Sequence, residues 1–126
     1  MATQQTSGSE VQSMQTAIAA QAVSGWRFAR AFARLTEYCT PDERRRYDAQ
    51  HRWFMRTLSE NIAIATMTLV DVEGQEYDPG MAITSLNLDE FGPTDHLVVD
   101  QMVEPIVLLN DTVIHTGVVT LRKEAE

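Results

Sequence analysis

The chain contains few residues that could do chemistry, and their spacing forms none of the usual sites. The three histidines, His51, His96 and His115, lie 45 and 19 residues apart, so no HxxxH zinc pair exists. Cys39 is the only cysteine, which excludes both a CxxC pair and an internal disulfide. No cation or base stands beside Cys39 to activate a thiolate, so we expect a small buried hydrophobic residue there.

Four acidic residues surround the turn at Gly74, but they do not have the spacing of a calcium loop; these are Asp71, Glu73, Glu76 and Asp78. We predict a solvated acidic turn and no metal site. Glycine-rich phosphate loops and a GxSxG nucleophile elbow are also missing from the sequence. The sequence therefore predicts no enzyme and no cofactor, but a protein that binds another macromolecule. The alternative is a small enzyme with a site built from His51, Tyr47 and arginines at a dimer interface.

The composition indicates a globular protein with an uneven charge. Its 126 residues are 44% hydrophobic and 22% charged, and the formal net charge is −8. Residues 1–62 carry eight arginines against six acids, whereas residues 63–126 carry two basic residues against twelve acids. A protein with a net charge of −8 repels nucleic acid and anionic lipids. With no membrane-length apolar run and no signal-peptide pattern at the start, we expect a cytoplasmic protein that binds neither.

Residues 10–62 have the pattern of a helical hairpin, preceded by polar residues 1–9 that we expect to be a disordered tail. Apolar residues recur at alternating spacings of three and four from Val11 to Cys39, as in a coiled coil. Trp26 lies beside this stripe and is expected to widen it. Thr40-Pro41 then forms an N-cap followed by proline at the first helical position, which starts a second helix that runs to about Asn61.

Each helix of the hairpin has an apolar stripe but only one neighbour, so we predict that two copies form a four-helix bundle. His51 lies on the stripe of the second helix, where we expect a partly buried, hydrogen-bonded side chain. The expected dimerisation residues are Met14, Ile18, Phe28, Phe32, Leu35, Tyr47, Phe54 and Leu58.

Residues 63–126 predict a small acidic β-domain, which makes the fold class α+β. A period-two pattern runs over 62–72, and a further strand is expected over 81–88. Two longer runs, 97–109 and 112–121, are joined across Asn110-Asp111, a two-residue hairpin signal. Pro105 predicts a bulge or an edge position in the first run, and Gly117 predicts a bulge in the second. We expect His115 to face solvent.

From Tyr77 onward the chain resembles GrpE, the nucleotide exchange factor of DnaK-class chaperone ATPases. The triplet Tyr77-Asp78-Pro79 matches the hydrophobic-Asp-Pro that follows the first strand of the GrpE β-domain, and an acidic turn at 89–93 follows the next strand. Residues 98–123 match the two closing strands of that family in length without a gap. The helical hairpin before them resembles the GrpE dimer bundle more loosely.

The resemblance implies a homodimer whose β-domain wedges against the chaperone ATPase, opens its nucleotide cleft and promotes ADP release. It assigns the partner contact to Tyr77, Pro79, Val103, Thr112 and Leu121. The chain departs from the family where Thr112 and His115 occupy two basic positions, and where 105–107 replaces Lys-Gly-aromatic. A GrpE-fold adaptor or scaffold protein without nucleotide exchange activity is the alternative.

Overall fold

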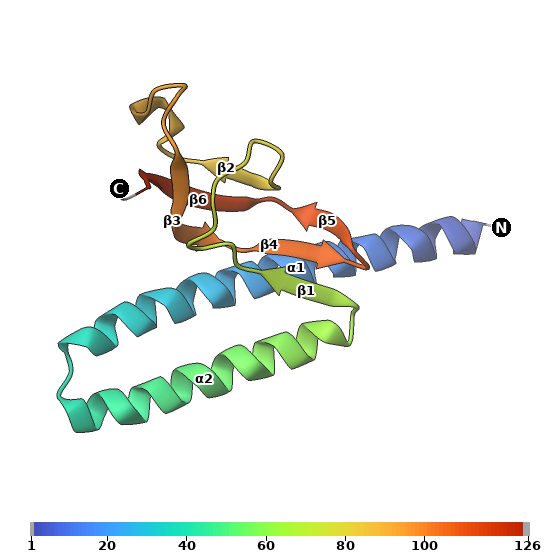
Figure 1. Ribbon diagram of the computed structural model, residues 1–126. Helices are drawn as coiled ribbons and strands as arrows, with labels where there is room; N and C mark the ends of the chain where they lie inside the picture. The colour runs from blue at the N-terminus through green and yellow to red at the C-terminus, as the bar shows by residue number, and fades with distance from the viewer. Residues whose placement is uncertain (1, 125–126) are drawn as a thin grey trace. The chain divides into compact units, whose positions relative to one another are not determined.

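The chain folds into two helices followed by a C-terminal β region of two sheets, which confirms the α+β class (Figure 1). This computed structural model describes residues 2–124, with side chains from residue 8 onward. The chain separates into two compact units, Met1–Met67 and Thr68–Glu126. We call the first unit the helical hairpin and the second the β-domain, and describe each by itself.

Helix α1 spans Ala2–Leu35, so the helix already includes residues 2–9, where the composition predicts a disordered tail. Alanine and glutamine favour the helix, and extending an existing helix costs far less than starting one. A short 3-10 helix, η1, follows at Thr36–Tyr38. Helix α2 spans Pro41–Ala63, two residues beyond the predicted end.

The turn between α1 and α2 is built by two residues. The Thr40 hydroxyl accepts a hydrogen bond from the Glu43 backbone N–H at 3.3 Å, which confirms Thr40 as the N-cap. The Arg44 guanidinium donates to the carbonyls of Thr36 (3.2 Å) and Glu37 (2.7 Å), which satisfies acceptors at the end of the preceding helical segment. These bonds hold α2 folded back on α1 as the predicted hairpin.

A tight turn ends α2 and leads to the first strand. Thr66 has a φ of 59°, and strand β1 spans only Met67–Val70. The period-two pattern begins at Ile62, the last residue of the predicted helical hairpin, and Ile62 lies in α2 and is buried there. The boundary is ambiguous in the sequence because a short apolar run is compatible with either structure.

The six strands form two three-stranded sheets, ordered β1-β4-β5 and β2-β6-β3. The remaining elements are β2 (Ile83–Ser85), the 3-10 helix η2 (Leu88–Glu90), β3 (Leu97–Glu104), β4 (Ile106–Leu109), β5 (Thr112–His115) and β6 (Gly117–Lys123). The strand predicted over 81–88 is therefore the three-residue β2. It pairs with β6 in parallel, whereas β3 pairs with β6 antiparallel.

The two long runs predicted at the C-terminus are joined as expected but are broken in the middle. Asn110 and Asp111 have φ values of 50° and 69°, as a type I′ turn requires, and Leu109 pairs with Thr112. Pro105 separates β3 from β4, because proline has no N–H to donate to a ladder. The two predicted strands therefore become four, shared between the two sheets.

Gly117 begins β6 at a very close contact in the core of the β-domain. A Cβ at this position would lie 2.7 Å from Met102 Cε and 3.2 Å from the Glu104 carbonyl oxygen. Met102 is fully buried at this contact, as are Val99, Val107 and Val119 elsewhere in the β-domain. Only glycine allows the strands to approach this closely.

Candidate partner-binding surfaces

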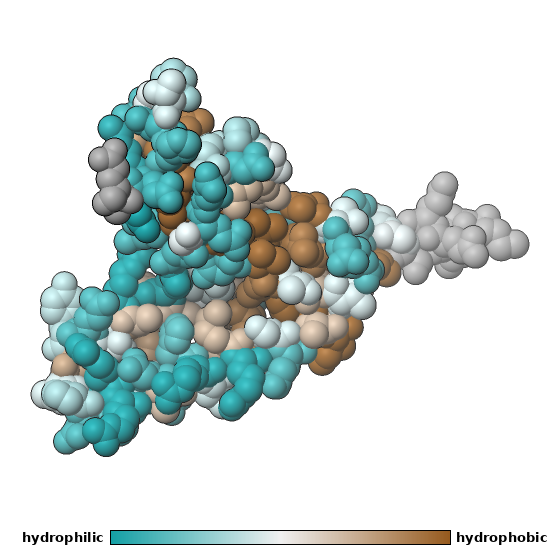
Figure 2. Space-filling view, in the orientation of Figure 1, coloured by the Kyte–Doolittle hydropathy of each residue, from teal (hydrophilic) through white to brown (hydrophobic). Residues whose placement is uncertain are grey.

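The helical hairpin exposes a stripe of large apolar side chains along α1. Val11 (49% exposed), Met14 (59%) and Ile18 (37%) form its first half. Phe28 (72%) and Leu35 (66%) continue it at the same heptad spacing. Four of these five residues are predicted dimerisation residues. The visible outer face of α2 is by contrast mostly hydrophilic (Figure 2).

Three of the other predicted dimerisation residues make contacts between α1 and α2, although Tyr47 is still 36% exposed. The rings of Phe32 and Tyr47 meet edge to face, with centroids 5.9 Å apart. The Phe54 ring lies so close to Gly25 that a Cβ there would be 3.2 Å from its Cζ atom. Leu58 is half-buried. These contacts hold α1 against α2.

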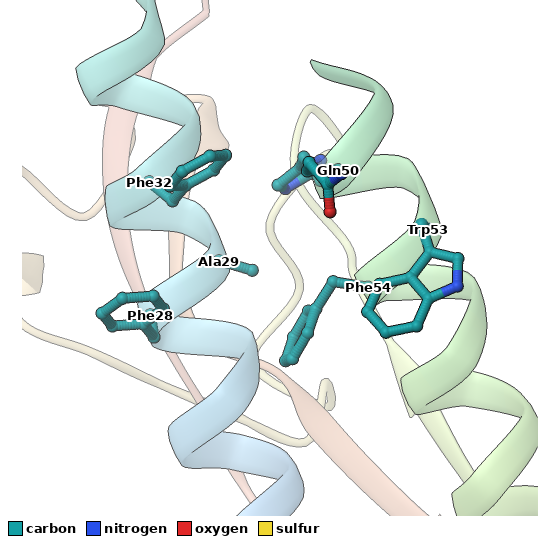
Figure 3. Close-up of a pocket in the computed structure, with 7 residues that line it drawn as sticks. Phe28, Ala29, Phe32, Gln50, Trp53 and Phe54 are labelled. Atoms are coloured by element: carbon teal, nitrogen blue, oxygen red, sulfur yellow. The ribbon is translucent and has the colours of Figure 1, made fainter. Parts of the chain in front are cut away.

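A pocket of about 210 Å³ opens between α1 and α2 (Figure 3). Its walls are mainly aromatic and comprise Phe28, Ala29, Phe32, Gln50, His51, Trp53 and Phe54. Trp53 is 55% exposed and stands beside Phe54 in the close-up. Gln50 and Trp53 were not predicted from the sequence, although Gln50, Trp53 and Phe54 have the spacing i, i+3, i+4 of one helix face.

His51 is half-buried in this pocket wall, as expected, but its hydrogen bonding differs from the prediction. Its Nε2 atom is enclosed and has no hydrogen-bond partner among the described residues. No carboxylate, cysteine or serine belongs to the pocket lining. The arrangement is suited to holding an apolar side chain rather than to proton transfer.

Trp26 is buried, as expected, whereas Cys39 is less buried than expected. Trp26 is buried, and the Arg30 guanidinium lies 5.0 Å from its ring centroid. Cys39 is half-buried rather than fully buried, with its Sγ 3.9 Å from the Leu35 carbonyl oxygen.

The predicted partner contacts of the β-domain do not form one cluster. The Tyr77 N–H donates to the Leu97 carbonyl at 2.8 Å, which places Tyr77 at the start of β3. Val103 is six residues further along β3, about 20 Å away at the rise of a strand. Thr112 is exposed on β5. Leu121 is only 2% exposed on β6, in the core, so its side chain is not available for a surface contact.

Tyr77 and Pro79 are the two predicted contacts that the structure brings together. With Glu76 and Asp78 they line a shallow hollow of about 430 Å³. Asp78 shapes the turn, because its carboxylate accepts the Gly80 N–H at 2.9 Å and its carbonyl accepts the Met81 N–H at 2.9 Å. The hollow therefore combines an aromatic ring, a proline and two carboxylates.

No protein family, curated protein or solved structure matched the chain. The GrpE resemblance consequently rests on the residues quoted above and on the order of the elements. Within residues 2–124, no helix is long and apolar enough to cross a membrane. The same residues contain no group of three or more histidine, cysteine or acidic side chains that could hold a metal ion.

His115 does not simply face solvent as predicted. It is half-buried, and its Nε2 lies 3.0 Å from the Oε1 atom of Glu104, the last residue of β3. The two basic residues of the β-domain also lie beside acids: Arg122 is 3.4 Å from Asp100, and Lys123 is 3.8 Å from Asp95. Acidic side chains thus dominate the surface of this unit.

Proposed function

We propose that this protein is a homodimeric GrpE-like co-chaperone that binds a DnaK-class ATPase through its β-domain and promotes release of ADP. The observation that carries the proposal is that one chain has both an exposed heptad stripe on its helical hairpin and, after the hairpin, a separate acidic β-domain. That order, an αα-hairpin and then a small β-domain, is the order expected from the GrpE resemblance. We further propose a cytoplasmic location, as expected from the missing signal-peptide pattern, and a role that needs no cofactor.

The exposed stripe supports dimerisation. Monomeric proteins rarely expose large contiguous apolar surfaces, and Met14, Ile18, Phe28 and Leu35 all exceed one third exposure on one helix face. A second copy that presents the same stripe would cover it, and two hairpins together make a four-helix bundle. The aromatic pocket beside Phe28 would then receive apolar side chains of the second copy.

The β-domain supports recognition of a basic surface. Its formal charge of −10 favours a positively charged partner and speeds encounter with one. The hollow at Tyr77 and Pro79 offers an aromatic and a proline contact together with the carboxylates of Glu76 and Asp78. Aromatic side chains are enriched at protein interfaces, and the carboxylates suit a basic partner surface.

Exchange requires no covalent chemistry from this chain. A protein that binds the open conformation of an ATPase better than the closed one lowers the affinity of that ATPase for nucleotide by the same coupling factor. The absence of a catalytic constellation among the lining residues of the hairpin pocket is compatible with this role.

The test is release of a fluorescent ADP from the DnaK-class ATPase of the same cell, measured by stopped flow with increasing amounts of this protein. We expect faster release, which Tyr77→Ala and Pro79→Ala reduce and Gln101→Ala, an exposed change on β3, leaves unchanged. No acceleration at saturating protein would refute exchange activity.

The adaptor alternative has one observation in its favour. Thr112 is neutral, and His115, the second position where the family has a basic residue, is held by Glu104. Both residues depart from the contact chemistry that the resemblance implies. Binding of the chaperone without any change in ADP release, measured by calorimetry on the same samples, would assign the chain to this class.

A further inference from the structure

We propose that the outer edge of β5 binds an extended, positively charged segment of another protein, which adds to the sheet as a further strand. This inference goes beyond the co-chaperone function and does not depend on it: β5 begins with Thr112, one of the expected chaperone contacts, but the inference rests on the free backbone edge of the strand and not on that side chain.

β5 is an edge strand by topology. In the order β1-β4-β5 it pairs with β4 on one side only. By contrast, the chain covers the outer edge of β3 with its own backbone. The Gly74 N–H donates to Val99 O and the Val99 N–H donates to Gln75 O, each at 2.9 Å.

β5 is also the strand with the longest exposed run among the described residues. Thr112 is exposed, Val113 is 43% exposed and Ile114 is 39% exposed. Successive side chains of a strand point to opposite faces, so the exposure of both Val113 and Ile114 leaves β5 open on both faces of the sheet. Figure 2 shows hydrophobic side chains gathered over β4 and β5.

The usual protection of an exposed edge is missing from β5. Natural proteins place lysine, proline or an inward-pointing charge on such edges to prevent pairing with another chain. The sequence Thr-Val-Ile-His contains no lysine and no proline, and its first three residues have strong β propensity. β2 avoids the problem because it is only three residues long.

The acidic charge of the β-domain favours a positively charged segment as the strand that pairs with β5. The domain carries twelve acidic residues against two basic ones, and exposed Asp111 directly precedes β5. Arg122 and Lys123, its two basic residues, lie beside acids at the far end of β6. Pairing of β5 with β5 of a second copy would bring two strongly acidic domains together, whereas a segment with lysine or arginine around a β-branched centre is attracted.

The test uses a synthetic peptide, acetyl-Gly-Lys-Val-Thr-Val-Thr-Lys-Gly-amide, and the full chain labelled with nitrogen-15. We expect amide shifts that are largest at 112–115 and that saturate with added peptide. Raising the salt from about 0.05 to 0.5 M should weaken binding severalfold, because the attraction is partly electrostatic. A peptide with N-methyl groups on alternate residues keeps its charge but cannot pair as a strand, and we expect it not to bind.

Matched variants separate the strand edge from net charge. Ile114→Lys places on β5 a lysine of the kind that protects strand edges from pairing, and it should weaken binding of the peptide at least tenfold. Thr68→Lys adds the same charge to an exposed position of β1, at the opposite edge of the same sheet, and should change affinity less than threefold.

Three outcomes would overturn the proposal: equal effects of the two lysine variants, undiminished binding of the N-methylated peptide, or shifts away from 112–115. Self-association that Ile114→Lys abolishes would likewise show that a second copy is the occupant. Because the chaperone is absent from these measurements, failure here leaves the exchange proposal standing, and failure of exchange leaves this one standing.

Discussion

The side-chain carboxamide of Asn87 pairs with both backbone groups of Leu121. Its Nδ2 donates to the Leu121 carbonyl at 3.0 Å, and its Oδ1 accepts the Leu121 N–H at 2.8 Å. The last backbone bond between these segments joins the Leu86 N–H to Val119 O. The carboxamide thus takes the place of a peptide group and extends the pairing of β2 with β6 beyond the end of β2.

Asn87→Ala should lower the free energy of unfolding by about 1–3 kcal/mol, since it leaves a donor and an acceptor of half-buried backbone without partners. Asn87→Asp keeps the acceptor for the Leu121 N–H but sets a carboxylate oxygen against the Leu121 carbonyl and the Glu90 carboxylate, so at neutral pH it should cost at least as much as the alanine change. Urea denaturation measures both, with Thr84→Ala, an exposed change on β2, as the control. Equal stabilities of Asn87→Ala and wild type would contradict the role of this carboxamide.

Gly117→Ala should destabilise the β-domain by about 1–3 kcal/mol, because the new Cβ overlaps Met102 and approaches the Glu104 carbonyl oxygen. The control is Gly92→Ala, where the nearest atom to a Cβ is a flexible Asp95 carboxylate oxygen at 3.6 Å. Thermal unfolding followed by circular dichroism compares the two. A Gly117→Ala protein no less stable than Gly92→Ala would rule out the close approach.

Asp111→Gly should stabilise the protein by up to about 1 kcal/mol, because Asp111 has a φ of 69° and glycine adopts positive φ without strain. Asp111→Val should destabilise it by about 1–2 kcal/mol, since a β-branched side chain is strained in that region. Chemical denaturation ranks the three proteins. The reverse order would mean that the turn is not type I′.

Phe28→Asp and Met14→Asp should each shift the protein from dimer to monomer, because a charge would be buried in the interface between two helical stripes. We expect the dimer dissociation constant to rise at least tenfold, as measured by sedimentation equilibrium. Ser13→Asp adds the same charge at an exposed position off the stripe and should leave the dimer intact. A wild-type protein that sediments as a monomer would contradict the dimer itself.

Local patterns predicted the helical hairpin and the turn between β4 and β5. Thr40-Pro41 marks the start of α2 because the cap involves only neighbouring residues, and Asn110-Asp111 marks the I′ turn for the same reason. The heptad spacing correctly identified an apolar stripe on α1. The early end of β2 was less predictable. Beyond it, the Asn87 side chain takes over the pairing by bonding to a residue 34 positions away in the sequence.

The dimerisation residues, too, could be predicted from the sequence only in part. Phe32, Tyr47 and Phe54 were assigned to dimerisation with Phe28 and Leu35, but only packing could show that the first three meet inside the hairpin. Period and heptad position do not distinguish an intramolecular neighbour from an intermolecular one.

The sequence by itself determined the helical hairpin, the cap at Thr40, the turn at Asn110-Asp111 and the acidic charge of the C-terminal half, because each depends on local periodicity, short-range sterics or composition. Only the tertiary structure decided that Pro105 and Gly117 divide one long hairpin between two sheets, that Leu121 is buried, and that β5 has an unprotected edge. These features depend on which strands become neighbours, and that pairing is settled by contacts between residues far apart in the chain.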